Sequence, residues 1–305
     1  MKHRLQKYIK HIIELSRKKE LTILPGNLAF YFLVSIIPVA SITFYICTFF
    51  NASLEVITSF IKNTFSTDVV SMLNPIFIKH GFSIETLIFV VMAFFIATNG
   101  ADAIIIASNS VFNIENKGII RRRIKAIILT ILIILLFSFM LFVPLFGGQI
   151  LNMIHSSGIK NIMIYSFKIL YPVLKIPISI IIMFFLIKAI YTIAPDEKVS
   201  SSSVNKGAIF TTTLWLLVTY GYSLYINTIA GKNFSIYYGS LANLIIVLMW
   251  FYFLAYVFVL GLIMNYRNVN KDIELTNTFK LQELNNKVSQ IKLDTVDIKN
   301  KKTSK

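Results

Sequence analysis

An uncharged stretch of twenty-three residues, Leu28 to Phe50, most restricts how this chain can fold. Five further apolar blocks of similar length follow it along the chain. A helix needs about 20 residues to cross a hydrocarbon core roughly 30 Å thick, because each residue adds about 1.5 Å. We therefore predict an all-α membrane protein with six transmembrane helices.

Composition agrees with this class, and the blocks divide the chain into three parts. Of the 305 residues, 56% are apolar and 14% are charged, so a water-soluble globule could not bury the apolar surface. Residues 1–27 are expected to form a basic amphipathic arm, 28–265 the membrane domain and 266–305 a polar, largely disordered tail. The six spans are expected over residues 28–50, 84–109, 124–146, 173–193, 207–229 and 241–265.

The distribution of positive charge predicts the orientation of the chain. Six crossings return the chain to its starting side, where 24 of the 30 Lys and Arg residues would lie, against six on the opposite side. Positive residues near span ends are retained in the cytoplasm. Both termini are therefore expected to be cytoplasmic, and topology accounts for the net charge of +16 without a nucleic-acid partner.

Three segments outside the spans have amphipathic patterns. The N-terminal arm, with its apolar stripe and its Lys and Arg residues, would lie on anionic headgroups at the inner leaflet, although a charge cluster that only sets topology explains it equally well. Residues 54–77 and 147–172 predict outer amphipathic segments. These segments could roof a cavity or lie on the outer leaflet.

The second span carries a polar face in its inner half. Thr98, Asn99, Asp102, Asn109 and Asn113 fall within an arc of about 120° on a helix. Apart from Glu85 at the outer end of the same block, Asp102 is the only acidic residue inside any span, and a charge at the bilayer centre costs about 2.5 to 3.5 kcal/mol. Asp102 could carry a proton or contact a cationic headgroup; alternatively it locks helices together or lies at the inner interface.

Weaker polar seams follow three other spans. They consist of Asn27, Tyr31, Ser35, Pro38, Ser41 and Tyr45 in span one, Thr212, Thr219, Ser223 and Asn227 in span five, and Asn243, Gly261 and Asn265 in span six. Pro38 also predicts a kink, which is either a hinge or a static bend. Small and hydroxyl residues commonly serve helix packing. So many seams in one chain also fit a polar cleft.

The motifs of catalysis and of metal binding are missing from the sequence. The four histidines form no HExxH pair, and the single cysteine, Cys47, allows neither an intrachain disulfide nor a thiolate metal site. A GKS or GKT phosphate loop, a GxSxG elbow and an acidic cluster for two metals are also absent from the sequence. We expect no enzyme activity, no cofactor and no metal.

Five stretches in fixed order resemble the YihY/BrkB family of bacterial inner-membrane proteins, once labelled ribonuclease BN. They are LAFYFLVSIIP, TNGADAIIIASNSVFN, RRRIKA, YTIAPD with KGAIFTTTLW, and YYGSLANLIIVLMWFY with LGLIMN. The resemblance implies six helices in the bacterial plasma (inner) membrane with both ends cytoplasmic. Relatives commonly end span six with a GAELN-like string, whereas this chain has Gly261-Leu262-Ile263-Met264-Asn265 and lacks the glutamate.

The resemblance adds residues to the candidate cleft, notably Gly100, Arg122, Tyr238, Gly239 and Trp250, and it also marks Pro195, Gly207, Ser240, Tyr252 and Gly261. The candidate cleft residues are Asn27, Tyr31, Ser35, Pro38, Asn99, Gly100, Asp102, Asn109, Asn113, Arg122, Thr219, Ser223, Tyr238, Gly239, Asn243 and Trp250. Since the family glutamate is absent, Asp102 would have to serve alone.

The function expected from these features is that of a transporter or flippase-like carrier, which moves a lipid or another amphiphile through a polar intramembrane cleft. The alternative is a non-transporting scaffold that organises lipids. The old ribonuclease label lacks the residues that hydrolysis requires. Expected partners are membrane lipids, with anionic headgroups at the cytoplasmic face and no nucleic acid. The substrate, the coupling ion and any homo-oligomer stay open.

Overall fold

The computed structural model describes residues 19–49, 84–115, 118–135, 161–225 and 240–303. The regular structure in these ranges is helical, and they contain no strand. The helices are α2 (Lys19–Phe49), α5 (Ile84–Phe112), a helix over residues 119–135, α7 (Asn161–Ile193), α8 (Asn205–Tyr225) and α10 (Ser240–Thr303). The predicted all-α class is confirmed.

Each predicted span overlaps one of these six helices. Two stretches, Val90–Phe112 and Ile245–Glu283, are long and apolar enough to cross a membrane, and Thr22–Ser35 and Pro177–Ile193 are shorter apolar helical stretches. The membrane character of the chain agrees with these helices. The count of six crossings and their orientation stay predictions.

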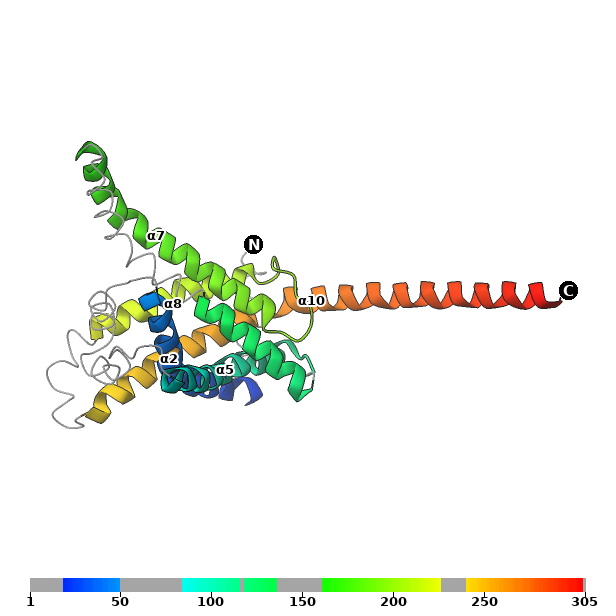
Figure 1. Ribbon diagram of the computed structural model, residues 1–305, viewed down its shortest axis with the longest axis horizontal. Coiled ribbons are helices and arrows are strands. Elements are labelled where there is room, and N and C mark those ends of the chain that lie inside the picture. Colours follow the sequence, from blue (N-terminus) through cyan, green and yellow to red (C-terminus); the bar gives the residue numbers. More distant parts are fainter. Residues whose placement is uncertain (1–18, 50–83, 116–117, 136–160, 226–239, 304–305) are drawn as a thin grey trace, which may run out of the picture.

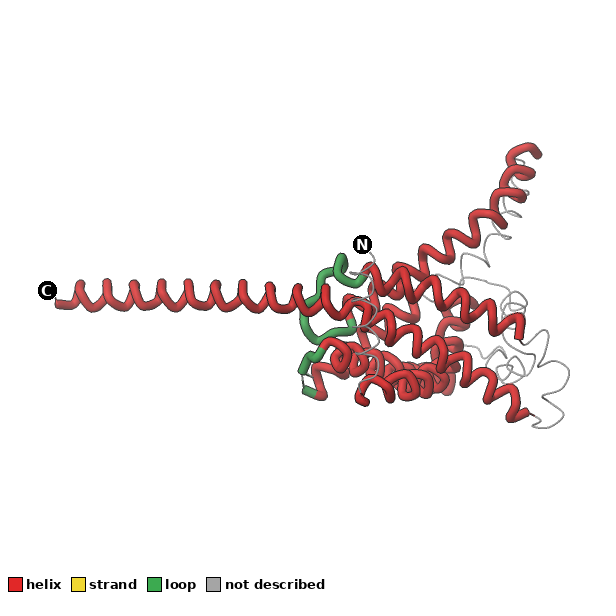
Figure 2. The backbone as a smooth tube through the Cα atoms, turned by 180° about the vertical axis from the view of Figure 1, so that it is seen from behind, coloured by secondary structure: helices red, strands yellow, loops and turns green. Residues whose placement is uncertain are grey.

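α10 is the helix around which the bundle is arranged. It contacts α2, α5 and α8, while α2 also packs on α5 and α7 packs on α8. Figure 1 shows α10 passing through the bundle and leaving it as a single long helix. The described loops, residues 113–115 and 194–204, lie at the end of the bundle where α10 emerges (Figure 2). Residues distant in sequence meet at this end.

The outer surface of the bundle is apolar. On α5 the side chains of Ile88, Met92, Phe95 and Ile96 lie on one stripe and are 44–64% exposed. On the opposite face of the helix, small and branched side chains such as Ile105 are buried. A stripe of large exposed apolar side chains is unfavourable in water but suits contact with lipid.

The C-terminal part of the chain differs from its prediction. Residues 266–303, expected to be largely disordered, continue α10 as one helix to Thr303. This segment contains neither Gly nor Pro, the two residues that most strongly disfavour a helix interior. An ion pair of 2.9 Å between Glu283 and Lys287 adds the i, i+4 contact that supports an exposed helix.

The helix starts also differ from the predicted boundaries. α2 begins at Lys19, before the predicted span, and continues through Pro25 and Pro38 to Phe49. α7 begins at Asn161, so residues 161–172 of the second outer segment are helical. Residues 1–18 of the arm, the outer segment 54–77 and residues 147–160 lie outside the described residues, and so do the alternatives proposed for them.

The contact between α8 and α10 is very close, and small residues permit it. A Cβ atom at Gly207 would overlap the carbonyl oxygen of Gly261 and the side chain of Asn265. A Cβ atom at Gly261 would overlap the Thr211 side chain. Glycine at both positions therefore lets the two backbones touch, as small residues do where membrane helices cross.

Polar bonds reinforce this contact at one-turn intervals. The Gly207 amide donates to Asn265 Oδ1 at 2.8 Å, and Trp215 Nε1 donates to the Leu254 carbonyl at 2.9 Å. Between them, the buried Tyr191 hydroxyl of α7 donates to the Phe258 carbonyl at 2.8 Å and lies 2.7 Å from Thr211 Oγ1. We call the contact made by residues 207, 211 and 215 with residues 254, 258, 261 and 265 the α8–α10 seam.

The substitution Gly207→Ala tests the seam. Because the added methyl group meets backbone that cannot rotate away, we expect a loss of about 1 to 3 kcal/mol of stability. The control Gly221→Ala lies in the same helix with nothing within 4 Å of the new Cβ, so we expect it to be neutral or slightly stabilising. Thermal unfolding followed by tryptophan fluorescence in detergent measures both. Equal melting temperatures for the two variants would contradict this account.

Candidate functional site

The polar face of α5 is occupied by contacts with the helix over residues 119–135. Asp102 Oδ1 lies 2.8 Å from Nε of Arg122, and the two side chains are 20% and 26% exposed. Three residues earlier, half-buried Asn99 accepts a hydrogen bond of 3.0 Å from Arg123 Nη1. The acid that the sequence singled out is therefore paired with the arginine that the family resemblance added.

The chain reversal after α5 explains why these residues meet. Asn113 has a φ of 55°, and the Ile114 amide donates to the Asn109 carbonyl at 2.9 Å. This is a Schellman-type helix end, in which Asn tolerates the left-handed conformation better than most residues. The next helix starts at residue 119, so its first turns carry Arg122 and Arg123 back beside the polar face of α5.

A second set of contacts surrounds a carboxylate that sequence analysis missed. Asp196, in the loop between α7 and α8, accepts a hydrogen bond of 2.8 Å from Nδ2 of the buried Asn109, and its own amide donates to Asn109 Oδ1 at 2.9 Å. Lys125 Nζ lies 3.2 Å from Asp196 Oδ1 and also donates to the Pro195 carbonyl. These contacts connect α5, the helix over residues 119–135 and the loop after α7.

Burial makes the Asp196 contacts stronger than a surface pair. The Asp196 side chain is 2% exposed and that of Lys125 is 21% exposed. A charge that is removed from water needs both an opposite charge and hydrogen bonds. Lys125 and Asn109 supply these to the Asp196 carboxylate, so a structural role accounts fully for this group.

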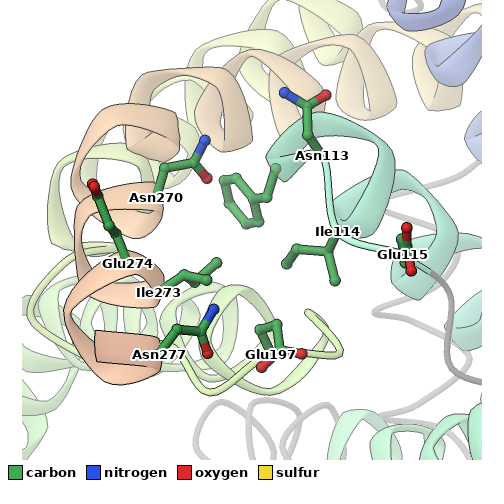
Figure 3. A pocket seen from close by; sticks show the side chains of 9 residues that line it. Asn113, Ile114, Glu115, Glu197, Asn270, Ile273, Glu274 and Asn277 are labelled. Atoms are coloured by element: carbon green, nitrogen blue, oxygen red, sulfur yellow. The ribbon is translucent and has the colours of Figure 1, made fainter. Parts of the chain in front are cut away.

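A cavity of about 620 Å³ lies next to these contacts (Figure 3). Ile114 and Ile273 face each other across it, while Asn270 and Asn277 of α10 and Glu197 of the α7–α8 loop border it. Its lining residues are Phe112, Asn113, Ile114, Glu115, Glu197, Asn270, Ile273, Glu274 and Asn277. Carboxylate and amide groups thus dominate its polar lining, and such groups suit cationic or hydrogen-bond-donating partners.

Asn113 connects the polar face of α5 with this cavity. It is exposed, lines the cavity, and donates from Nδ2 to the Tyr266 hydroxyl of α10 at 3.0 Å. The polar positions of α5 therefore run from Asn99 through Asp102 and Asn109 to the cavity.

The predicted seam of span one lies partly in a helix contact. Ser35 and Pro38 are buried, Tyr31 is half-buried and Asn27 is exposed. A Cβ atom at Gly100 would lie 2.6 Å from Ser35 Oγ, so Gly100 allows α2 and α5 to approach closely. The buried Ser35 hydroxyl has no hydrogen-bond partner among the described residues.

The remaining predicted residues are dispersed. Thr219 is half-buried and Ser223 is exposed on α8, while Trp250 of α10 stacks on Tyr222 with ring centroids 5.1 Å apart. The α8–α10 seam uses a face of α8 that neighbours the predicted one. Asn243 belongs to α10 but its side chain is outside the description, and Tyr238 and Gly239 lie outside the described residues.

Several important contacts involve residues that the sequence did not single out. Asp196 lies just beyond a predicted span, so a search for acids inside spans passed over it. The two basic residues Arg123 and Lys125 fitted charges that only set topology. Tyr191 fitted an ordinary position in an apolar helix. The signal that could have found Asp196 was an acid directly after an apolar block. Within the described ranges, no group of three or more His, Cys, Asp or Glu residues could hold a metal ion.

The fold and these contacts define an α-helical protein of membrane character, whose charged and amide side chains gather at one end of the bundle. The chain belongs to the virulence factor BrkB family, whose family model matches residues 12–280. It is also 30% identical over 174 residues to the ribonuclease-like protein YfkH of Bacillus subtilis (strain 168), a match that covers 56% of this chain and 61% of the relative. No solved structure matches the chain.

The substitution Asp196→Asn tests the buried carboxylate. It leaves Lys125 and Asn109 without their charged partner, and we expect a loss of about 3 kcal/mol of stability because one member of a buried ion pair is removed. The control Glu283→Gln breaks a pair whose side chains are 67% and 69% exposed, so we expect at most about 1 kcal/mol. Thermal unfolding in detergent compares them, and an equal effect of both substitutions would refute the role given to Asp196.

Proposed function

We propose that this protein is a carrier in the bacterial plasma membrane that moves a lipid or another amphiphile along a polar cleft beside α5. The observation that carries the proposal is the ion pair of Asp102 with Arg122, because Asp102 belongs to a helix long and apolar enough to cross a membrane. Charged groups at such positions are expensive and usually functional. With side chains 20% and 26% exposed, the pair is neither sealed nor fully solvated.

The polar positions around this pair support a path for a headgroup. Asn99 and Asp102 follow one face of α5, and Asn113, farther along this helix, lines the cavity of about 620 Å³. A headgroup that crosses hydrocarbon needs polar partners at each depth, because an unpaired polar group is costly there. The carboxylates Glu115, Glu197 and Glu274 around the cavity favour a headgroup that carries a positive charge.

The proposed mechanism treats the ion pair as an exchangeable contact. An amine-bearing headgroup that reaches Asp102 can replace the Arg122 guanidinium as the cation of this ion pair. Release of the headgroup then restores the original pair. Because the sequence has no nucleotide-binding loop, movement follows a concentration gradient or an ion gradient.

Orientation is part of the same proposal. We propose six crossings with both termini in the cytoplasm, supported by the 24 of 30 basic residues that this arrangement places on one side. Under this arrangement, the cavity and the Asp196 contacts lie at the cytoplasmic end of the bundle. Substrate would therefore enter or leave the cleft from the inner leaflet.

The variants Asp102→Asn and Arg122→Gln test the carrier. In proteoliposomes with fluorescent phosphatidylethanolamine, we expect each variant to slow movement between leaflets by roughly tenfold or more, which corresponds to about 1.4 kcal/mol of barrier. The matched control Asp294→Asn, in the part of α10 beyond the bundle, is expected to keep the wild-type rate. Melting temperature is measured in parallel so that unfolding is recognised. A folded wild-type protein that moves neither labelled lipids nor other amphiphiles would refute the proposal.

A second candidate function is a scaffold, and the continuation of α10 favours it. This helix leaves the bundle and reaches Thr303 (Figure 1), and many residues of its sequence in this part are charged. A helix of this kind offers a surface for partner proteins or for anionic lipid. The relative's name calls that protein ribonuclease-like; for this chain we propose no RNA cleavage.

Truncation separates the two candidates. Removing residues 281–305 leaves intact every residue that lines the cavity, since the lining of α10 ends at Asn277. A carrier is expected to keep its transport rate after this truncation and to lose it with Asp102→Asn. A scaffold is expected to lose its cellular phenotype with the truncation and to keep it with Asp102→Asn. Complementation of a deletion strain, combined with the proteoliposome assay, measures both.

A further inference from the structure

A second pocket differs sharply in charge from the cavity of Figure 3. It has a volume of about 290 Å³ and lies between the start of α8 and the part of α10 that leaves the bundle. Its lining residues are Lys206, Met264, Arg267, Asn268 and Lys271. Three cationic side chains thus converge on one small pocket that has no carboxylate in its lining.

These three cations have no anionic counterpart in the described structure. Lys206, Arg267 and Lys271 are exposed, and none of them takes part in an ion pair found among the described residues. The neighbouring carboxylate of Asp272 accepts a hydrogen bond from the Ser203 hydroxyl. Like charges that converge repel one another unless an anion lies between them. The pocket is therefore electrostatically suited to an anion.

The start of α8 adds to this field. Lys206 is the second residue of a helix of 21 residues, and the first turn of a helix carries partial positive charge on its amide groups. The Gly207 amide is already used by Asn265, so the cationic side chains make the principal contribution. Arginine and lysine together suit a phosphate group, since arginine can donate two parallel hydrogen bonds to it.

The pocket lies where both helices change from polar to apolar. α10 is apolar up to Met264, which lines the pocket, and its first basic residue is Arg267. On α8, Ile209 follows Lys206 on the same face and is 57% exposed. Basic side chains at such a boundary meet lipid phosphates, while the adjacent apolar side chains meet the acyl chains.

The two pockets occupy different faces of α10. Residues 264, 267, 268 and 271 follow one helical stripe, and residues 270, 273, 274 and 277 follow another. Cations therefore gather on one face, and Glu274 with amide groups on the other. A ligand on the cationic face is kept apart from the carboxylates of the cavity.

We propose that the pocket formed by Lys206, Arg267 and Lys271 binds the phosphate group of an anionic phospholipid at the inner leaflet. The site requires neither Asp102 nor movement of lipid, so only its placement at the inner leaflet rests on the orientation in the proposed function. Phosphate is the shared chemistry, and a lipid headgroup is the favoured source because the pocket borders apolar surface.

The test compares lipid binding by the full-length protein and by a triple variant. The triple variant is Lys206→Gln/Arg267→Gln/Lys271→Gln. Native mass spectrometry measures the affinity of the wild type and of this variant for phosphatidylglycerol, with phosphatidylcholine as the zwitterionic reference. We expect the triple variant to bind phosphatidylglycerol roughly tenfold more weakly or worse, with little change for phosphatidylcholine. The control Lys280→Gln/Lys292→Gln/Lys299→Gln removes the same charge farther along α10 and is expected to bind as wild type.

The outcomes separate the sources of phosphate. If millimolar inorganic phosphate displaces phosphatidylglycerol from the wild type, phosphate is the group that the pocket recognises, which supports the proposal. If the wild type binds inorganic phosphate but binds phosphatidylglycerol no better than phosphatidylcholine, the site belongs to a free anion and the lipid proposal is overturned. Equal phosphatidylglycerol affinity for wild type, triple variant and control would overturn the site. If the triple variant does not fold, the single variant Lys206→Gln serves, because its side chain is exposed. We expect it to weaken binding about threefold, and unchanged affinity would overturn the proposal.

Discussion

Close backbone contact at the α8–α10 seam is the constraint on which the rest of the structure depends. In a lipid environment apolar side chains gain little by leaving lipid for one another, so helices associate through tight packing and hydrogen bonds. Gly207 and Gly261 allow the contact, and Asn265 bonds the Gly207 amide across it. Because α10 also contacts α2 and α5, its position at the seam determines where the other helices lie.

Polar side chains at the end where α10 leaves the bundle form two sets of contacts that differ in burial. The contacts of Asp196 with Asn109 and Lys125 are buried, and they give both oxygens of the carboxylate a partner. They therefore hold the loop after α7 against α5. The Asp102–Arg122 pair is less buried and lies between helices that are consecutive in sequence. A short loop already keeps those two helices together, so this pair adds less to the fold than the Asp196 contacts. It is correspondingly freer to take part in binding.

Apolar block length and helical periodicity were enough to predict the all-α class, the six helices and the polar face of α5. Partners across space could not be predicted from one sequence, because a helical face does not reveal which neighbour it meets. The sequence predicted a polar stripe on α8 that includes Thr219 and Ser223. The α8–α10 seam instead uses Gly207, Thr211 and Trp215. Asp196 was missed because its importance comes from burial by other elements. The helix beyond residue 265 was missed because polar composition does not by itself exclude helix.

The unbroken course of α10 gives the chain a mechanical property. One helix is both a partner in the seam and the segment that reaches Thr303, and no Gly or Pro interrupts it beyond the seam. At about 1.5 Å per residue, the part after Asn265 extends for roughly 55 Å. A tilt of about 10° where α10 crosses α8 would swing the distal tip by roughly 10 Å. The helix after Asn265 would thus act as a lever arm, which converts a small change in the angle between α8 and α10 into a large displacement of its tip.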